Sequence, residues 1–380
     1  MRTAFEVAGV LRNHWSEVEQ HAHINAWQLR TLGAIMRCRT AALGGHVDAC
    51  TSCGTIRISY DSCRNRHCPK CQGKNREEWI QKRENELLPV PYFHVVFTLP
   101  DLLNPLALYK PKEVYDALFE ASWETLKTFG NDHKHLGANT GMISILHTWG
   151  QTLTLHPHVH CIVPGGGLTK QGKWRTARSE GKYLFPVKAM SKVFRAKYVE
   201  ALENKVGVLD KKLKNDLFKK KWVVYAKRPF GEPKDVLEYL GRYTHKVAIS
   251  NHRIAIIDKN TMTFSYKDYR QGGKKLEMTL DSMEFIRRFA MHILPKKFVK
   301  IRHYGILSST SKKVTIPTIL LQMPENKTAL VKHIVVAEPF NPRMCPCCKT
   351  ETMVTIENLL KRGPPKLQLR PLLVSESVNN

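Results

Sequence analysis

Apolar positions recur along the chain in two distinct periods, and together they predict a mixture of helices and strands. Helical spacing, with apolar residues three and four apart, dominates residues 1–45 and 111–130. Asp281 followed by Glu284 matches a capping box, which predicts that a helix begins there. Helices are therefore expected over residues 1–45, 76–90, 111–130, 186–221, 233–246 and 281–294.

Runs rich in β-branched and aromatic residues, bounded by proline or glycine, predict the strands. The clearest run is "YFHVVFTLP" at residues 92–100. Residues 252–258 and 261–269 are separated by two residues and predict a hairpin. Strands, helices and hairpins mix without a regular alternation, so we expect an α+β fold with an antiparallel sheet. Further strands are expected over residues 141–150, 155–167 and 298–307, whereas residues 308–380 show only a weak pattern.

The charge of the chain adds information that the pattern lacks. The 380 residues include 60 Lys and Arg against 33 Asp and Glu, which gives a net charge of +27. This excess favours a polyanionic partner, usually nucleic acid, with a merely basic soluble enzyme as the alternative. No apolar run reaches the roughly 18 residues that cross a bilayer, and no secretion signal is evident. We therefore expect a cytoplasmic protein whose ten cysteines are metal ligands or buried thiols.

Two CxxC pairs, Cys50 with Cys53 and Cys68 with Cys71, have 14 residues between them. This spacing is typical of structural zinc sites, in which four ligands surround one ion. The segment has few apolar residues, so without metal it would have little reason to fold. More ligands are present than one ion needs, so either Cys63 is a spare thiol or a second ion shares a bridging cysteine. Further candidate zinc ligands are Cys63, His67 and His46, with Cys38 upstream.

Basic residues surround these two pairs, and they either bind DNA phosphates or form a solvated face. The candidate DNA-binding residues are Arg64, Arg66, Lys70 and Lys74.

A third cysteine pair lies far from the first two in the sequence. Cys345, with Cys347 or Cys348, would form half a zinc site that His333 or another domain completes.

Three histidines alternate in "LHPHVHCIVPGGG", residues 155–167. Alternate residues of a strand share one face, so His158 and His160 lie close enough to hold one ion. Nitrogen ligands with an oxygen donor and open positions suit Mg²⁺ or Mn²⁺ acting on a phosphate, whereas the plainer interpretation is ordinary half-buried histidines. Gln151 is the candidate third ligand, with His156 and His147 as alternatives.

Two tyrosines four residues apart, Tyr239 and Tyr243, share one face of the helix expected over residues 233–246. With Val236 and Leu240 they also match the stripe of a plain core-facing helix. A tyrosine hydroxyl can attack a phosphodiester. Because its free pKa is about 10, it is protonated at neutral pH and needs a metal-polarised phosphate. The pair gains a functional meaning only together with the histidine strand and the cysteine segment.

The order of these segments resembles the transposases of the insertion sequence 91 family, which are rolling-circle, HUH-type enzymes with two tyrosines. The resemblance covers roughly residues 20–305 and includes "FHVVFTLP", "HPHVHCIVPGGG", "YLGRYTHKVAIS" and "RHYG". It implies an HUH endonuclease domain with a central antiparallel sheet, flanking helices and a small zinc-binding domain before it. In that family the HUH motif corresponds to His158, Val159 and His160, the nucleophiles to Tyr239 and Tyr243, and the zinc-binding segment to Cys50 through Cys71. Related nucleases often place a third ligand slightly upstream, which favours Gln151.

The resemblance implies a DNA transposase that nicks and rejoins single-stranded DNA at element ends through a covalent 5′-phosphotyrosine. Its expected partners are single-stranded or hairpin element ends and target DNA in a prokaryotic nucleoid, with structural Zn²⁺ and catalytic Mg²⁺ or Mn²⁺. The motif GxxxxGK[ST] is absent, so a host helicase or supercoiling must open the duplex. The rival functions are an HUH-type replication initiator or relaxase and a non-catalytic zinc-finger DNA-binding protein. The expected domains are a helical and zinc-binding domain (1–90), a catalytic domain (91–307) and a C-terminal extension with a partial zinc knuckle (308–380).

Overall fold

The computed structural model describes residues 4–21, 23–72, 87–177, 184–227, 236, 246–323 and 341–361. Its central sheet is antiparallel throughout, with strand order β12-β4-β5-β3-β8, so the histidine strand β5 lies in the middle. The α+β class and the central antiparallel sheet are thereby confirmed. The strands of this sheet are β3 (Tyr92–Thr98), β4 (Gly141–Trp149), β5 (Leu155–Pro164), β8 (Val224–Lys227) and β12 (Ile301–Gly305).

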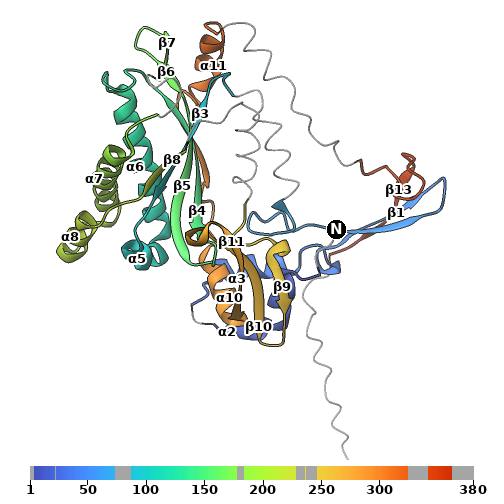
Figure 1. Ribbon diagram of the computed structural model, residues 1–380. Coiled ribbons are helices and arrows are strands. Elements are labelled where there is room, and N and C mark those ends of the chain that lie inside the picture. The colour runs from blue at the N-terminus through green and yellow to red at the C-terminus, as the bar shows by residue number, and fades with distance from the viewer. Residues whose placement is uncertain are drawn as a thin grey trace, which may run out of the picture.

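Helices cover one face of this sheet, as Figure 1 shows. Alternate strand residues such as Val95, Phe97 and Val159 point into a core that α6 and α7 complete with Phe119 and Phe194. The intervening residues, which include the histidines, therefore lie on the opposite face. The helices here are α5 (Asn104–Tyr109), α6 (Pro111–Asn131), α7 (Val187–Val206) and α8 (Lys211–Lys219), with the short η2 (Asp101–Leu103) and the hairpin of β6 (Gly166–Leu168) and β7 (Trp174–Thr176).

Most of the expected elements form, with differences where the chain turns. The helix expected over 186–221 is two helices, because Gly207 has φ +90 and ends the first of them. The expected hairpin exists and continues into a strand that the sequence pattern did not predict, β11 (Lys274–Asp281). The other elements of this region are η3 (Asn251–Arg253), β9 (Ile254–Ile257), β10 (Thr261–Asp268), η4 (Tyr269–Gln271) and α10 (Ser282–Met291).

Two expected helices fall largely outside the described residues. Of residues 76–90 only 87–90 are described, and they are not helical. Of residues 233–246 only Val236 and Lys246 are described. Val236 is helical and buried among apolar residues on the face of the central sheet that α6 and α7 leave uncovered.

The N-terminal helices share a core with the second sheet, β11-β10-β9, across a long distance in sequence. Leu11 and Leu32 pack in one cluster with Phe264, Phe285 and Phe289. Contacts therefore cross the expected domain boundary at residue 90, and the three-domain division stays a prediction. These N-terminal elements are α1 (Val7–Asn13), α2 (Trp15–Gln20) and α3 (Ala26–Met36), followed by η1 (Ala41–Leu43).

A third sheet joins residues that lie far apart in the sequence. Strand β1 (Gly45–Cys50) pairs on one side with β2 (Ile56–Tyr60) and on the other with β13 (Met353–Leu359). We call residues 45–60 together with 341–359 the arm, because they extend away from the central sheet in Figure 1. The weakly patterned region after residue 308 thus contributes a strand here, and it also forms α11 (Lys312–Leu320).

Asp281 caps the N-terminus of α10. The Asp281 carboxylate accepts hydrogen bonds from the backbone amides of Met283 at 2.9 Å and Glu284 at 3.1 Å. Glu284 does not complete the expected capping box in the structure, because its carboxylate binds Arg287 and Arg288. Asp281→Ala should lower the unfolding free energy by about 1 kcal/mol, while Asp281→Asn retains most of the stability. Urea unfolding followed by circular dichroism measures both, and an unchanged Asp281→Ala would show that the cap is unimportant.

Candidate functional site

Three histidines from two neighbouring strands meet at one end of the central sheet. His147 on β4 lies directly opposite His158 on β5, and His160 is two residues further along β5. The β pleat directs all three to the face away from α6 and α7. Their ligand nitrogens all lie within 4.8 Å of one another. The expected pair of His158 and His160 is therefore brought together, and His147 joins it.

The distance between the nitrogens fits a shared metal ion. His158 Nε2 and His160 Nε2 are 3.1 Å apart. Two nitrogens that each bind one ion at about 2.1 Å stand about 3.0–3.4 Å apart when the ligand angle is about 90–109°. Without an ion, the two nitrogens could share at most one proton, so that one Nε2 would donate a hydrogen bond to the other. The arrangement accordingly fits a divalent cation.

Hydrogen bonds at the far side of each ring orient the two central histidines. His158 Nδ1 donates to the backbone carbonyl of His156 at 2.6 Å, so its Nε2, which faces His160, carries the lone pair. His160 Nδ1 lies 2.9 Å from Nε2 of His94 on β3, and the two rings stack. A partner at the second nitrogen fixes the tautomer and raises the basicity of a ligand histidine.

Burial keeps these imidazoles neutral. It lowers the pKa of His158 to about 4 and holds the pKa of His160 well below its usual range. Neutral imidazole is the form that binds metal, so both side chains are ready for ligation at physiological pH. His156 is outside the group, and burial lowers its pKa as well.

Gln151, the candidate third ligand, lies in the same groove but is engaged elsewhere. Its side-chain oxygen accepts a hydrogen bond from the backbone amide of Lys267 at 3.4 Å. His147 occupies the position beside the pair instead, and Trp149 stacks on its ring. The geometry thus favours His147 as third ligand, one of the alternatives that the sequence left open.

A groove of about 1430 Å³ opens in front of the histidines. Aromatic and basic side chains from the second sheet and from β8 line it together with the histidines. Tyr225 and Tyr269 are 55% and 71% exposed, so their rings are available to a ligand. Such a surface suits a polyanion with planar bases. The basic residues that line it are Lys246, Arg253, Lys267, Arg270 and Lys275.

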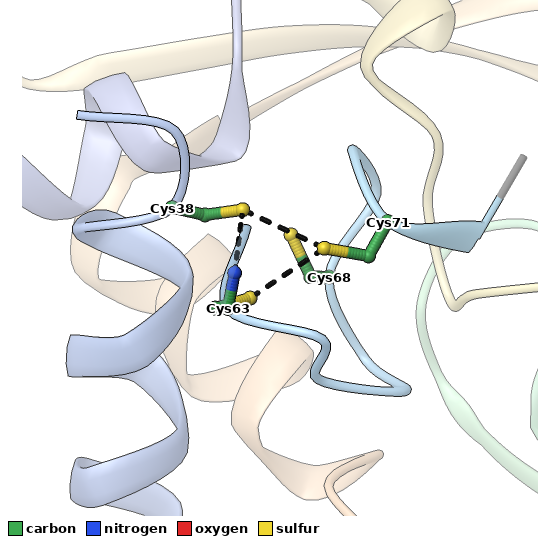
Figure 2. Close-up of side chains that lie close together, drawn as sticks. All are labelled: Cys38, Cys63, Cys68 and Cys71. Atoms are coloured by element: carbon green, nitrogen blue, oxygen red, sulfur yellow. Dashed lines mark hydrogen bonds between the residues drawn. The ribbon is translucent and has the colours of Figure 1, made fainter. Parts of the chain in front are cut away.

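Among the described residues, eight cysteines gather in two groups that share no cysteine, whereas the sequence had left open one ion or two ions with a bridging cysteine. Cys68 and Cys71 lie with Cys38 and Cys63, as Figure 2 shows. Cys50 and Cys53 lie with two cysteines of the third pair, Cys345 and Cys348. The two expected CxxC pairs thus belong to different groups, because β1 and β2 carry the first pair into the arm while the loop after β2 returns the second pair to α3.

The first group has the dimensions of a tetrahedral thiolate site. Cys71 Sγ lies 3.5 Å from Cys38 Sγ and 3.7 Å from Cys63 Sγ. Four sulfurs that each bind zinc at about 2.3 Å stand about 3.8 Å apart. Cys63 is therefore a full member of this group, while neither His67 nor His46 belongs to either group. His46 instead faces the carboxylate of Asp48 at 3.5 Å.

The candidate DNA-binding residues of this segment differ in their surroundings. Arg64 is exposed. Arg66 donates to the backbone carbonyls of Phe298 and Pro295, and burial lowers its pKa. Lys70 pairs with Glu6 at 2.7 Å and donates to the carbonyl of Cys38, while Lys74 lies outside the described residues. Arg66 and Lys70 thus tie the segment to the rest of the chain, which leaves Arg64 as the candidate for DNA among the three described residues.

Both candidate nucleophiles, Tyr239 and Tyr243, lie outside the described residues. His94 was not among the residues predicted from the sequence, and Cys38 was noted only as lying upstream of the candidate zinc ligands. The sequence pattern could have identified His94, because it lies on the predicted strand 92–100. It is four residues from Thr98, which pairs with His158, so His94 and Thr98 share one face of the sheet. No helix of the described part of the chain is long and apolar enough to cross a membrane.

Comparison with known proteins agrees with this geometry. Residues 10–99 match the family described as "Transposase zinc-binding domain", and residues 141–314 match the family described as "Putative transposase". The "Putative transposase y4qJ" of Sinorhizobium fredii is 42% identical over 392 aligned residues, which cover 96% of this chain and 98% of the relative. The "Transposase for insertion sequence element IS801" of Pseudomonas savastanoi pv. phaseolicola is 28% identical over 307 residues, covering 78% of this chain and 74% of the relative. No solved structure matches the chain.

The match of one segment to a transposase zinc-binding domain and of another to a transposase family, together with the cysteine groups, defines a DNA transposase with structural zinc. The chain belongs to the insertion sequence 91 family of transposases, and a rolling-circle mechanism fits that family. The resemblance in sequence is thereby confirmed, as is the function class of DNA transposase.

Proposed function

We propose that this transposase nicks and rejoins single-stranded DNA at the ends of its element, using Tyr239 and Tyr243 as nucleophiles. The observation that carries the proposal is the convergence of His147, His158 and His160 at the floor of a basic, aromatic groove. A site of three imidazoles at the floor of a groove that could take a phosphodiester backbone is suited to polarising a phosphate rather than to holding the fold together. The sequence places two tyrosines on a segment that follows this groove's β8 wall.

The covalent step balances without a nucleotide cofactor. The hydroxyl oxygen of one tyrosine bonds to the scissile phosphorus, the bond from phosphorus to the 3′ oxygen breaks, and the proton of the phenol ends on that oxygen. The product is a 5′-phosphotyrosine and a free 3′ hydroxyl. The second tyrosine does the same at the other DNA end, and each 3′ hydroxyl then reverses the step on a different strand. Phosphodiester energy is kept throughout, so strands are exchanged without hydrolysis.

The residues of the chain have separate parts in this reaction. His147, His158 and His160 would hold a divalent ion, which supplies Lewis-acid polarisation of the scissile phosphate. His94 acts as a positioning residue, because it orients the ring of His160. Imidazole ligands suit Mn²⁺ better than Mg²⁺, which prefers oxygen. We therefore expect Mn²⁺ to support nicking at a lower concentration than Mg²⁺.

The groove residues would hold the strand itself. Opening of the duplex at element ends or target is left to a host helicase or to supercoiling, in the nucleoid of a prokaryotic cell. Bases stack on exposed aromatic side chains, and basic groups neutralise the phosphates between them. Tyr269 and Tyr225 stand at the groove with Arg270 and Lys275, so the strand has both kinds of contact there.

Tyr269 offers a direct test of this groove. Stacking of a base on an aromatic side chain contributes about 1–3 kcal/mol, so Tyr269→Ala should weaken binding of a single-stranded oligonucleotide roughly 5- to 150-fold. Tyr109→Ala is the matched control, because Tyr109 is 81% exposed on α5 and does not line the groove. Fluorescence anisotropy measures both, and equal losses in the two variants would contradict the assignment of the groove.

The function is tested by a covalent adduct. Labelled single-stranded DNA from an element end, incubated with the protein and Mn²⁺, should yield a protein–DNA adduct that survives denaturation. The double variant Tyr239→Phe with Tyr243→Phe should yield none, while each single variant should still form one. An adduct in the double variant would show that another residue is the nucleophile. Binding without cleavage by the unmutated protein, on both element ends, would favour a non-catalytic DNA-binding protein.

A further inference from the structure

The cysteines of the arm come from two parts of the chain separated by almost 300 residues. Cys50 and Cys53 follow β1, whereas Cys345 and Cys348 precede β13. The match to a transposase zinc-binding domain covers residues 10–99 and thus contains only half of this group. We propose that these four cysteines bind a second zinc ion, which clamps residues 341–359 to the N-terminal zinc-binding region.

The two halves of the site are built alike. The Cys50 amide donates to the Thr55 carbonyl at 2.9 Å, and the Cys345 amide donates to the Thr350 carbonyl at 2.8 Å. The residue after each second cysteine, Gly54 or Lys349, has positive φ, +70 and +61, and its amide donates back to the first cysteine's carbonyl. Left-handed backbone is uncommon for a residue such as lysine, so the repeated turn indicates a shared constraint.

The four sulfurs face one another across these turns. Cys50 Sγ lies 3.6 Å from Cys348 Sγ, and Cys53 Sγ lies 3.6 Å from Cys345 Sγ. These distances are far above the roughly 2.05 Å of a disulfide and close to the 3.8 Å or so between sulfurs around one zinc ion. Threonine hydroxyls lie beside three of the sulfurs at 3.0–3.1 Å, where they can donate to thiolates: Thr352 at Cys50, Thr55 at Cys53 and Thr350 at Cys348.

Among the described residues, the arm has only a very small apolar core. The apolar cluster of the arm contains three buried residues, Cys50, Cys345 and Met353, and Cys348 packs against it. On β2, Ile56 and Ile58 are mainly exposed, so this strand adds no core. A small sheet without a core needs a metal or disulfides to be stable, and the thiols here are not bonded to one another.

A line of polar contacts crosses the arm and depends on its closure. The Asp48 carboxylate on β1 accepts from Arg57 on β2 at 2.8 Å and from Thr355 on β13 at 2.8 Å. The Arg57 guanidinium also donates to the carbonyl of Pro342 at 2.8 Å. The clamp therefore brings β13 and the segment before it against the basic N-terminal region, and loss of the ion releases them.

Zinc stoichiometry tests the proposal independently of nicking. Every chain in the experiment carries His158→Ala, so that the histidine site adds no zinc. The parent should hold two zinc ions by native mass spectrometry, Cys345→Ser one, and Cys345→Ser with Cys68→Ser none. Cys347→Ser is the matched control, since Cys347 is an exposed thiol between the two ligands and outside the group, and it should keep two.

Two further measurements test the second zinc site even if a variant fails to fold. X-ray absorption on the parent should show every zinc surrounded by four sulfurs. Limited proteolysis should cut the Cys345→Ser chain near residues 341–359, while the Cys347→Ser chain resists. One zinc in the parent, or two in Cys345→Ser, would overturn the second site. Either result would leave the adduct experiment unaffected, so the two proposals fail separately.

Discussion

His158→Ala and His160→Ala should each abolish most nicking while leaving the fold intact. The two Nε2 atoms are 3.1 Å apart and both belong to the proposed ligand set, so loss of either would leave that site incomplete. Polarisation of a phosphate by a bound cation is worth several kcal/mol in the transition state, which corresponds to about a thousandfold in rate. Single-turnover cleavage of element-end DNA at saturating Mn²⁺ measures the loss.

Neighbouring histidines provide a graded control series. His156→Ala should nick at close to the normal rate, because His158 bonds to the backbone carbonyl of His156 and not to its side chain. His94→Ala should nick at an intermediate rate, because His94 orients His160 but is outside the ligand group. Its metal affinity should fall about 10- to 100-fold, and excess Mn²⁺ should partly restore nicking. If His156→Ala were as damaging as His158→Ala, the ligand set would have to include His156.

Cys68→Ser should unfold the N-terminal region as well as remove one zinc ion. Its sulfur is fully buried among Cys38, Cys63 and Cys71, and these thiols pack in the same core as Leu11, Leu32 and Phe285. Structural zinc contributes about 10–16 kcal/mol in small zinc domains, which is comparable to the whole stability of a typical domain. Replacing this thiolate with serine therefore removes more stabilising free energy than the region has in its folded state.

Thermal unfolding combined with zinc release measures this effect. The Cys68→Ser chain should lose a cooperative transition that the unmutated chain shows, and a strong chelator should produce the same loss. Cys347→Ser, which alters an exposed thiol, serves as the control. An unchanged transition in Cys68→Ser would mean that the packing of α1 and α3 against α10 suffices without metal.

The strands of the site could be predicted from the sequence, because the residue pattern that defines each strand lies within a few neighbouring positions. Residues 141–150 and 155–167 carry the β pattern, and the spacing of His158 and His160 alone places both on one face. His147 was only one of several options, because its position depends on the register between β4 and β5 and on the bulge that follows it. A shift of one residue would have turned it to the helical face.

The cysteine grouping could not be predicted for a different reason. Spacing along the chain indicates which cysteines share a turn, but it does not indicate which turns meet. Cys38 follows a helix, and Cys345 belongs to a region with little pattern, so neither carries a local signal for its partners. The packing of α3 and the pairing of β13 with β1 decide both groups, and these are contacts between distant segments.

The pairing of β1 with both a near and a distant strand has a consequence for synthesis. Strand β2 is available to β1 as soon as some ten more residues have been made, but β13 leaves the ribosome about 300 residues later. Until then one edge of β1 is uncovered, and an uncovered strand edge invites pairing with another chain. The arm is therefore completed only once translation has passed residue 359, so a prematurely terminated transposase would carry the three clustered histidines but an unfinished arm.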